Sequence, residues 1–253
     1  MPRVRWPWRR RDPAAANDLP AGWESIVDRN VPLWAGLETD ERANAIEALG
    51  AVLAKRFEAA RGFSIDDEIR VTIAAHAALL AVALDLSCFD DVPSIVVHPT
   101  TLVIDRPRHT GIGGVVSEGA AVIGVAHDRR GPVLLAWDAV RRDAHVPERG
   151  RNVVLHEFAH KLDLMDRVID GTPIVDSGLR ARWIEVCTAE FEALRDGMPS
   201  ALDRYGATNP GEFFAVATEA FFCTPIEIVE RHPDLYGVLA EFYGQDPAVR
   251  VTR

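Results

Sequence analysis

The spacing of hydrophobic positions changes twice along this chain, and each change predicts a different kind of element. Over residues 39–62 and 66–86, apolar side chains recur every three or four positions, which is the spacing of one face of a helix. Thr39, followed by acidic residues, predicts the start of the first of these helices, and Gly62 predicts its end. Residues 22–36 carry the apolar contacts of a shorter helix and turn. The first part of the chain is therefore expected to be helical.

Short runs of β-branched residues replace this spacing in the middle of the chain. They are bounded by turn-forming residues, which is typical of strands. The predicted strands cover residues 94–98, 101–104, 115–126 and 131–137. Helical spacing then returns and predicts helices at 152–165, 180–195, 210–222, 225–232 and 235–243. Helices, then a small sheet, then helices indicate an α+β fold, mostly helical, with a small mixed sheet before the later helices.

The chain has no strong internal linker, so we expect one main domain. Residues 1–20 are predicted to form a flexible basic tail, and residues 21–253 a single domain. Within that domain a helical part (21–90) precedes the sheet (91–140) and a second helical part (150–253). The tail is rich in arginine and tryptophan, but no apolar core follows it as it would in a signal peptide.

Composition narrows the classes of function. The formal net charge of -10 argues against a general nucleic-acid binder. The three cysteines are far apart and form no C-x-x-C, which favours a reducing, cytoplasmic location. No apolar run reaches the roughly 18 residues that a membrane span requires, so none is expected. The hydrophobic fraction of 48% predicts a substantial core.

The helix predicted at 152–165 carries the motif H-E-x-x-H, from His156 to His160. Positions i and i+4 of a helix lie on the same face, so both imidazoles can meet one zinc ion. Glu157 lies about 100° further round the helix, where it can act as a general base toward a water molecule at the metal. The alternative is a pair of core histidines with a buried glutamate. Burying three polar groups without an ion is costly, which favours the metal site.

A hydrolytic zinc site usually has a third protein ligand, and the chain offers several carboxylates for it. The extended three-histidine pattern fails, because Asp163 and Asp166 stand where its glycine and third histidine would be. The available glutamates are Glu185, Glu190, Glu192, Glu212 and Glu219. Glu212 and Glu219 share a helix face but lie about 10.5 Å apart along the axis, so both cannot bind one ion. Residue types favour Glu212 over Glu219, although Glu212 also fits a helix-start role after Asn209 and Pro210.

Two motifs at these positions resemble the Mlc titration factor A family of bacterial zinc peptidases, whose active site is similar to that of anthrax lethal factor. The motifs are HEFAHKLD at residues 156–163 and YGATNPGEFFAV at residues 205–216. The strand at 131–137 and the Trp-Pro-Trp at residues 6–8 are also similar. The resemblance extends from about residue 23 to residue 250. It implies a zincin-like catalytic core of the gluzincin class.

The resemblance also implies roles for individual residues. His156, His160 and Glu212 would hold Zn²⁺, and Glu219 would lie behind the ligands or in the helix packing. Tyr205, seven residues before Glu212, would be catalytic beside Glu157 by donating a hydrogen bond to the oxyanion. For Asp163 we expect a bond to a ligand imidazole, with a plain helix-end acid as the alternative.

The expected function is therefore zinc-dependent hydrolysis of a peptide or protein substrate. A substrate strand could pair with the edge at residues 115–126. The resemblance further implies a partner, a transcriptional repressor of the Mlc type, which regulates the enzyme or is acted on by it. Two alternatives remain at this stage. The chain could be a module that sequesters such a regulator with a structural or regulatory zinc, or a helical scaffold with a vestigial metal site.

Overall fold

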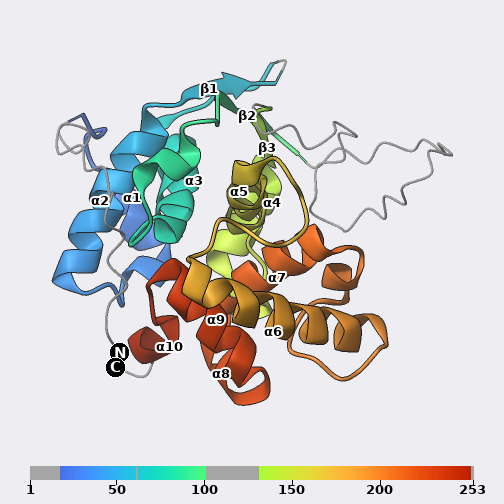
Figure 1. The fold of residues 1–253 in the computed structure, drawn as a ribbon. Coiled ribbons are helices and arrows are strands. Elements are labelled where there is room, and N and C mark those ends of the chain that lie inside the picture. Colours follow the sequence, from blue (N-terminus) through green and yellow to red (C-terminus); the bar gives the residue numbers. More distant parts are fainter. Residues whose placement is uncertain (1–17, 61, 101–130, 252–253) are drawn as a thin grey trace, which may run out of the picture.

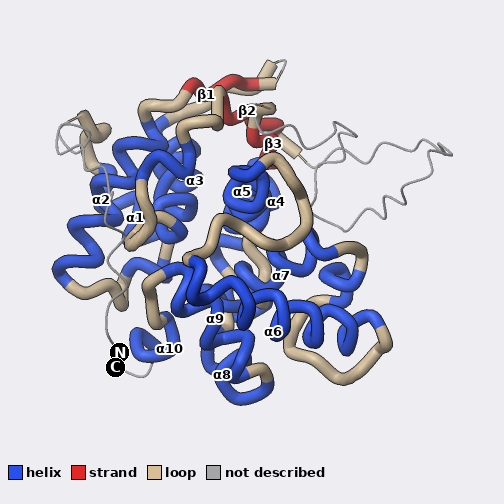
Figure 2. Tube along the Cα trace, viewed as in Figure 1, coloured by secondary structure: helices blue, strands red, loops and turns tan. Residues whose placement is uncertain are grey.

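The computed structural model describes residues 18–60, 62–100 and 131–251 and shows a mostly helical chain with one small sheet (Figures 1 and 2). Its helices are α1 (Trp23–Asn30), α2 (Thr39–Leu53), α3 (Asp67–Leu80), α4 (Trp137–His145), α5 (Val153–Asp163), α6 (Ser177–Arg195), α7 (Pro210–Cys223), α8 (Pro225–Arg231), α9 (Pro233–Tyr243) and α10 (Pro247–Val251). The α+β class is as predicted. Among the described residues, no helix combines the length and apolar content needed to cross a membrane.

The sheet contains β1 (Arg56–Ala59), β2 (Ser94–His98) and β3 (Val133–Ala136) in that spatial order. The described strands all run parallel, whereas a mixed sheet was predicted. Connections between parallel strands must cross over, and here α3 lies in the connection from β1 to β2. The strands predicted at 101–104 and 115–126, like most of the predicted tail, lie outside the described residues.

Strand β1 corrects the prediction of one long helix over residues 39–62. Helix α2 ends at Leu53, and Phe57 then pairs with Ile95 of β2. The apolar spacing around Phe57 suits either element, and pairing with a distant strand decides between them. The start of α2 also differs by one residue, because Glu38 rather than Thr39 is the N-cap and its N–H donates to the Glu41 carboxylate.

Two further boundaries differ from the prediction. Helix α3 ends at Leu80 rather than at residue 86, and a short 3-10 turn follows at Leu86–Phe89. Trp137, predicted as the end of a strand, instead opens α4, which the hydrophobic spacing did not predict. His76 is buried within α3, where its Nδ1 lies 2.9 Å from the Thr72 carbonyl oxygen, so it is a packed core histidine.

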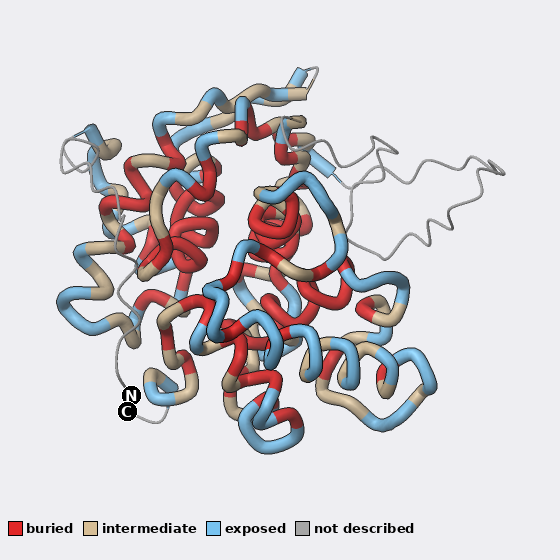
Figure 3. The backbone as a smooth tube through the Cα atoms, viewed as in Figure 1, coloured by how far each residue is buried: buried red, intermediate tan, exposed pale blue. Residues whose placement is uncertain are grey.

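Helix α5 lies at the centre of the molecule, and its position determines where the motif histidines point. It packs against α7, α3 and β3, and both α5 and α7 are almost wholly buried (Figure 3). The Phe158 ring meets Phe89 edge-on with 5.0 Å between centroids. Nearly all of the buried apolar residues in the described part of the chain form one continuous core. The core thus holds two helices side by side that begin more than fifty residues apart in the sequence.

Candidate metal centre

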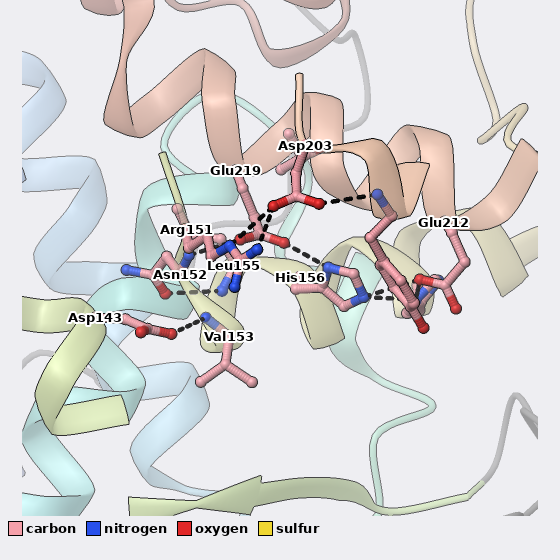
Figure 4. Close-up of polar contacts among 12 residues, drawn as sticks. Asp143, Arg151, Asn152, Val153, Leu155, His156, Asp203, Glu212 and Glu219 are labelled. Carbon is pink, nitrogen blue, oxygen red and sulfur yellow. Dashed lines mark hydrogen bonds and ion pairs between the residues drawn. The ribbon is translucent and has the colours of Figure 1, made fainter. Parts of the chain in front are cut away.

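Helix α5 begins at Val153, three residues before the first motif histidine. Every backbone N–H in its first turn has a hydrogen-bond acceptor. Asn152 is the N-cap, and its side chain accepts hydrogen bonds from the N–H groups of Val154 and Leu155, both at 3.1 Å. The remaining N–H, that of Val153, donates to the Asp143 carboxylate of α4 at 3.1 Å (Figure 4). These bonds satisfy donors that a buried helix start would otherwise leave without partners. Neither contact was predicted from the sequence; an asparagine at the start of a helix is a local signal for the first, whereas nothing local signals the second.

His156, His160 and Glu212 converge on one point. The Nε2 atoms of the two histidines are 3.2 Å apart. A Glu212 carboxylate oxygen lies 3.1 Å from His156 Nε2 and 3.4 Å from His160 Nε2. All three residues are buried, and one potential ligand atom from each lies within 4.8 Å of the others. The arrangement therefore brings together the three residues that the sequence singled out for a metal.

The chemistry of these atoms fits a metal ion. Glu219 lies 2.5 Å from His156 Nδ1, so in the neutral imidazole the proton belongs on Nδ1 and the lone pair on Nε2. That lone pair faces a carboxylate oxygen and a second imidazole nitrogen, which is repulsive unless a cation or a proton lies between them. Ligands bonded to tetrahedral zinc at 2.0–2.1 Å would be about 3.3 Å apart, close to the observed separations.

The charges around the site raise the pKa of His156 and lower the pKa of Glu212, so the pair favours a positive charge between the two side chains. Burial alone would lower the pKa of His156, but the carboxylates of Glu219 and Glu212 outweigh it and raise that pKa well above its usual range. Burial opposes ionisation of Glu212, yet hydrogen bonds from His156 and His160 hold its pKa well below the usual range. A metal would replace a proton here, so its affinity should depend on pH.

Glu219, the alternative third ligand, faces His156 Nδ1, on the opposite side of the ring from the Nε2 atom that faces Glu212 and His160. One carboxylate oxygen faces His156 Nδ1, and the other accepts the Asn152 N–H at 2.7 Å. Figure 4 shows Glu219 and Glu212 on opposite sides of the His156 ring. Glu219 thus fixes the ring orientation and joins α7 to the start of α5.

The other predicted alternatives lie on α6, outside this cluster. Glu190 pairs with His232 at 2.8 Å. Glu185 and Glu192 are exposed. Among the described residues, the cluster of converging ligand atoms contains none of these three glutamates.

Tyr205 and Glu157 border the cluster. Tyr205 lies in the 3-10 turn η6 (Arg204–Ala207), and its ring centroid is 6.1 Å from that of His156. Burial and the neighbouring charge and hydrogen bond of Glu212 raise the pKa of Tyr205, so the phenol keeps its proton and can donate. Glu157 is partly buried on α5, and its charge contributes to the raised pKa values of both His156 and Tyr205. Both residues therefore lie near the ligand cluster.

Asp163, at the end of α5, bonds to a loop. Its Oδ2 accepts the Gly171 N–H at 3.0 Å, while no described group donates a hydrogen bond to its Oδ1. Burial raises the pKa of Asp163 to about 6, against the opposing effects of the Gly171 bond and the charge of His160. The described bond is thus a loop contact, and the expected bond to a ligand imidazole is not among the described contacts.

Comparison with known proteins places the chain among metallo-peptidases. The family model described as glucose-regulated metallo-peptidase M90 matches residues 5–244. The protein slr2042 of Synechocystis is 34% identical over 251 residues, which cover 96% of this chain and 90% of that protein. Mlc titration factor A of Cronobacter sakazakii is 30% identical over 257 residues, covering 98% of this chain and 94% of that protein. The Serratia proteamaculans protein of the same name is 29% identical over 258 residues, covering 99% and 96%.

Proposed function

The chain belongs to the glucose-regulated metallo-peptidase M90 family, and from this premise we propose that it is a zinc-dependent peptidase with a zincin-like core. The ligands would be His156, His160 and Glu212. The observation that carries the proposal is the convergence within 4.8 Å of three buried ligand atoms, two from the H-E-x-x-H helix α5 and one from α7. Two imidazoles and one carboxylate are a typical ligand set for catalytic zinc and leave one position open.

The residues around the centre suit peptide hydrolysis. Bound zinc would polarise the substrate carbonyl and lower the pKa of a water molecule. Glu157 would take the proton of that water and pass it to the leaving amine. Tyr205 keeps its phenolic proton and would donate a hydrogen bond to the carbonyl oxygen as negative charge develops there. Glu219 would keep the His156 ring oriented through Nδ1.

Metal content and peptidase activity, measured on the same samples, test this proposal. We expect about one zinc per chain in the wild type. His156→Ala and Glu212→Ala should lose zinc and activity together. Glu157→Gln should keep zinc and lose hydrolysis, and Tyr205→Phe should keep zinc and turn over more slowly. Full activity in Glu157→Gln, or zinc retained in Glu212→Ala, would contradict the assignment.

The relatives named Mlc titration factor A favour a second function compatible with the first. The chain would bind a transcriptional regulator of the Mlc type through its protein surface. A purified Mlc-type repressor should then bind the wild type and Glu157→Gln with equal affinity. Binding that depended on Glu157 would instead indicate that the regulator occupies the peptidase site.

A further inference from the structure

Arg151 joins the start of the H-E-x-x-H helix to the segment that carries Tyr205. It directly precedes the N-cap of α5, and its Nε donates to Asp203 Oδ2 at 3.0 Å. Its Nη2 donates to the same oxygen, so two N–H groups of one guanidinium bind one carboxylate oxygen (Figure 4). The two residues are 52 positions apart in the sequence. The pair therefore ties together two segments that the local sequence does not connect.

The other oxygen of the same carboxylate holds the backbone of Tyr205. Asp203 is the N-cap of η6, and its Oδ1 accepts the Tyr205 N–H at 2.8 Å. A 3-10 turn this short has little stability of its own, so its cap and its packing decide where it lies. A Cβ on Gly206 would lie only 3.2 Å from the Leu194 side chain and 3.3 Å from that of Val216. The turn is thus packed closely against α6 and α7, and Asp203 holds the N–H of its second residue, Tyr205.

Arg151 contacts Asp203 and is also close enough to Glu219 and Asp143 to feel their charges. Its hydrogen bond to Asp203, against the opposing effect of burial, raises the pKa of the guanidinium, and the charges of Glu219 and Asp143 add to the rise. Each carboxylate holds a different part of the site. Asp203 holds the turn of Tyr205, Glu219 holds His156, and Asp143 holds the first turn of α5. Arg151 is therefore placed among the carboxylates that hold these three parts of the site.

We infer that Arg151 and Asp203 are positioning residues that place the Tyr205 phenol beside His156 and Glu212. Neither belongs to the cluster of converging ligand atoms, and both act through the backbone of η6. The inference rests on the proposed function only for the role of Tyr205 in hydrolysis. The placement of the ring can be measured separately.

The chain contains three tyrosines, Tyr205, Tyr236 and Tyr243, so fluorine NMR of 3-fluorotyrosine-labelled protein resolves this position. The Tyr205 signal is assigned by its loss in Tyr205→Phe. Asp203→Asn keeps the shape and one acceptor oxygen but cannot serve both Arg151 and the turn. We expect the Tyr205 signal to shift and broaden in this variant while the other two stay in place. An unchanged Tyr205 signal, or equal changes in all three, would overturn the inference.

Arg151→Met gives a second route to the same result, and Arg151→Lys should restore part of the wild-type signal. The matched control is Arg182→Met. Arg182 pairs with Glu241, and its side chain is 49% exposed, close to the 47% exposure of the Arg151 side chain. This control should leave the Tyr205 signal unchanged. A control that perturbed the signal as strongly as Arg151→Met would show a general effect of losing a surface charge, and it would overturn the inference.

Kinetics give the functional readout. Asp203→Asn should lower kcat/KM about tenfold with unchanged metal content, since a displaced donor loses part of its effect on the transition state. Combining it with Tyr205→Phe should produce no further loss beyond Tyr205→Phe alone. Losses that multiply would show that Asp203 acts independently of Tyr205 and would overturn the inference. If the wild type shows no Glu157-dependent hydrolysis, the proposed function fails, and the NMR result still decides the placement of Tyr205.

Discussion

The imidazole of His156 lies between two glutamates of the same helix, and the nitrogen that each one faces determines its role. Glu212 lies 3.1 Å from Nε2, on the side of His160, whereas Glu219 lies 2.5 Å from Nδ1. A carboxylate at Nδ1 fixes the tautomer and makes Nε2 a more basic ligand. Two residues of identical chemistry on one helix face therefore serve different purposes, one toward the metal and one behind the ring.

Replacing Glu219 by glutamine should weaken zinc binding while leaving the three candidate ligands in place. The neutral amide keeps the shape of the side chain but stabilises the Nδ1 proton less well. We expect a loss of about 10- to 100-fold in zinc affinity, measured by competition with a chelator. Glu190→Gln is the matched control, because Glu190 pairs with a different buried imidazole, His232, at 2.8 Å. Equal zinc affinities in the two variants would contradict this role for Glu219.

At the scale of elements, the loop between α5 and α6 holds the two helices of the centre in position. Gly171 in this loop has φ +73°, and its N–H donates to Asp163 at the end of α5. Its carbonyl oxygen accepts the indole N–H of Trp183 at 3.1 Å. A Cβ at this position would lie 2.4 Å from the carbonyl oxygen of Pro210, in the first turn of α7. The loop is therefore wedged against the turn that carries Glu212.

Gly171→Ala should destabilise the protein and weaken the metal centre together. The new methyl group meets the Pro210 carbonyl and the backbone is strained at positive φ, so we expect a loss of roughly 2 to 4 kcal/mol in unfolding free energy. Urea unfolding and zinc affinity measure the two effects. Gly22→Ala is the control, because Gly22 has φ +75° but no atom within 4 Å of the added Cβ. The explanation fails if Gly171→Ala is no more harmful than Gly22→Ala.

For the molecule as a whole, the buried histidine of α3 makes folding stability depend on pH. Burial lowers the pKa of His76 from 6.5 to about 4, although its bond to the Thr72 carbonyl opposes the change. The folded state therefore keeps His76 neutral where the unfolded chain binds a proton. Because the unfolded state then holds more protons, this contribution is complete above about pH 6.5 and is lost as the pH falls toward 4.

His76→Gln should flatten this part of the pH dependence. Glutamine stays neutral, so the stability difference between wild type and variant should fall by up to about 3 kcal/mol between pH 7 and pH 4. Urea unfolding at several pH values measures it, and titration of all other groups cancels in the comparison. A difference that stays constant over this range would show that His76 does not carry the effect.

Local patterns predicted more of the helices than of the sheet. Apolar spacing located α5, α6 and α7 to within a few residues, because helix hydrogen bonds join positions four apart. The same spacing failed at β1, where Phe57 pairs with Ile95, and α4 was not predicted at all. Strand pairing joins residues far apart in the chain, so a short segment carries little information about it.

The sequence by itself determined that His156 and His160 share one helix face with a glutamate between them, because that relation depends only on helix geometry. It also determined a helical protein with an apolar core and a metallo-peptidase motif. Only the tertiary structure decided that Glu212 faces both histidines while Glu219 faces Nδ1, and that Arg151 reaches Asp203. These relations depend on how α5, α7 and η6 pack together. That packing is determined by contacts spread over the whole core, which no local stretch of sequence contains.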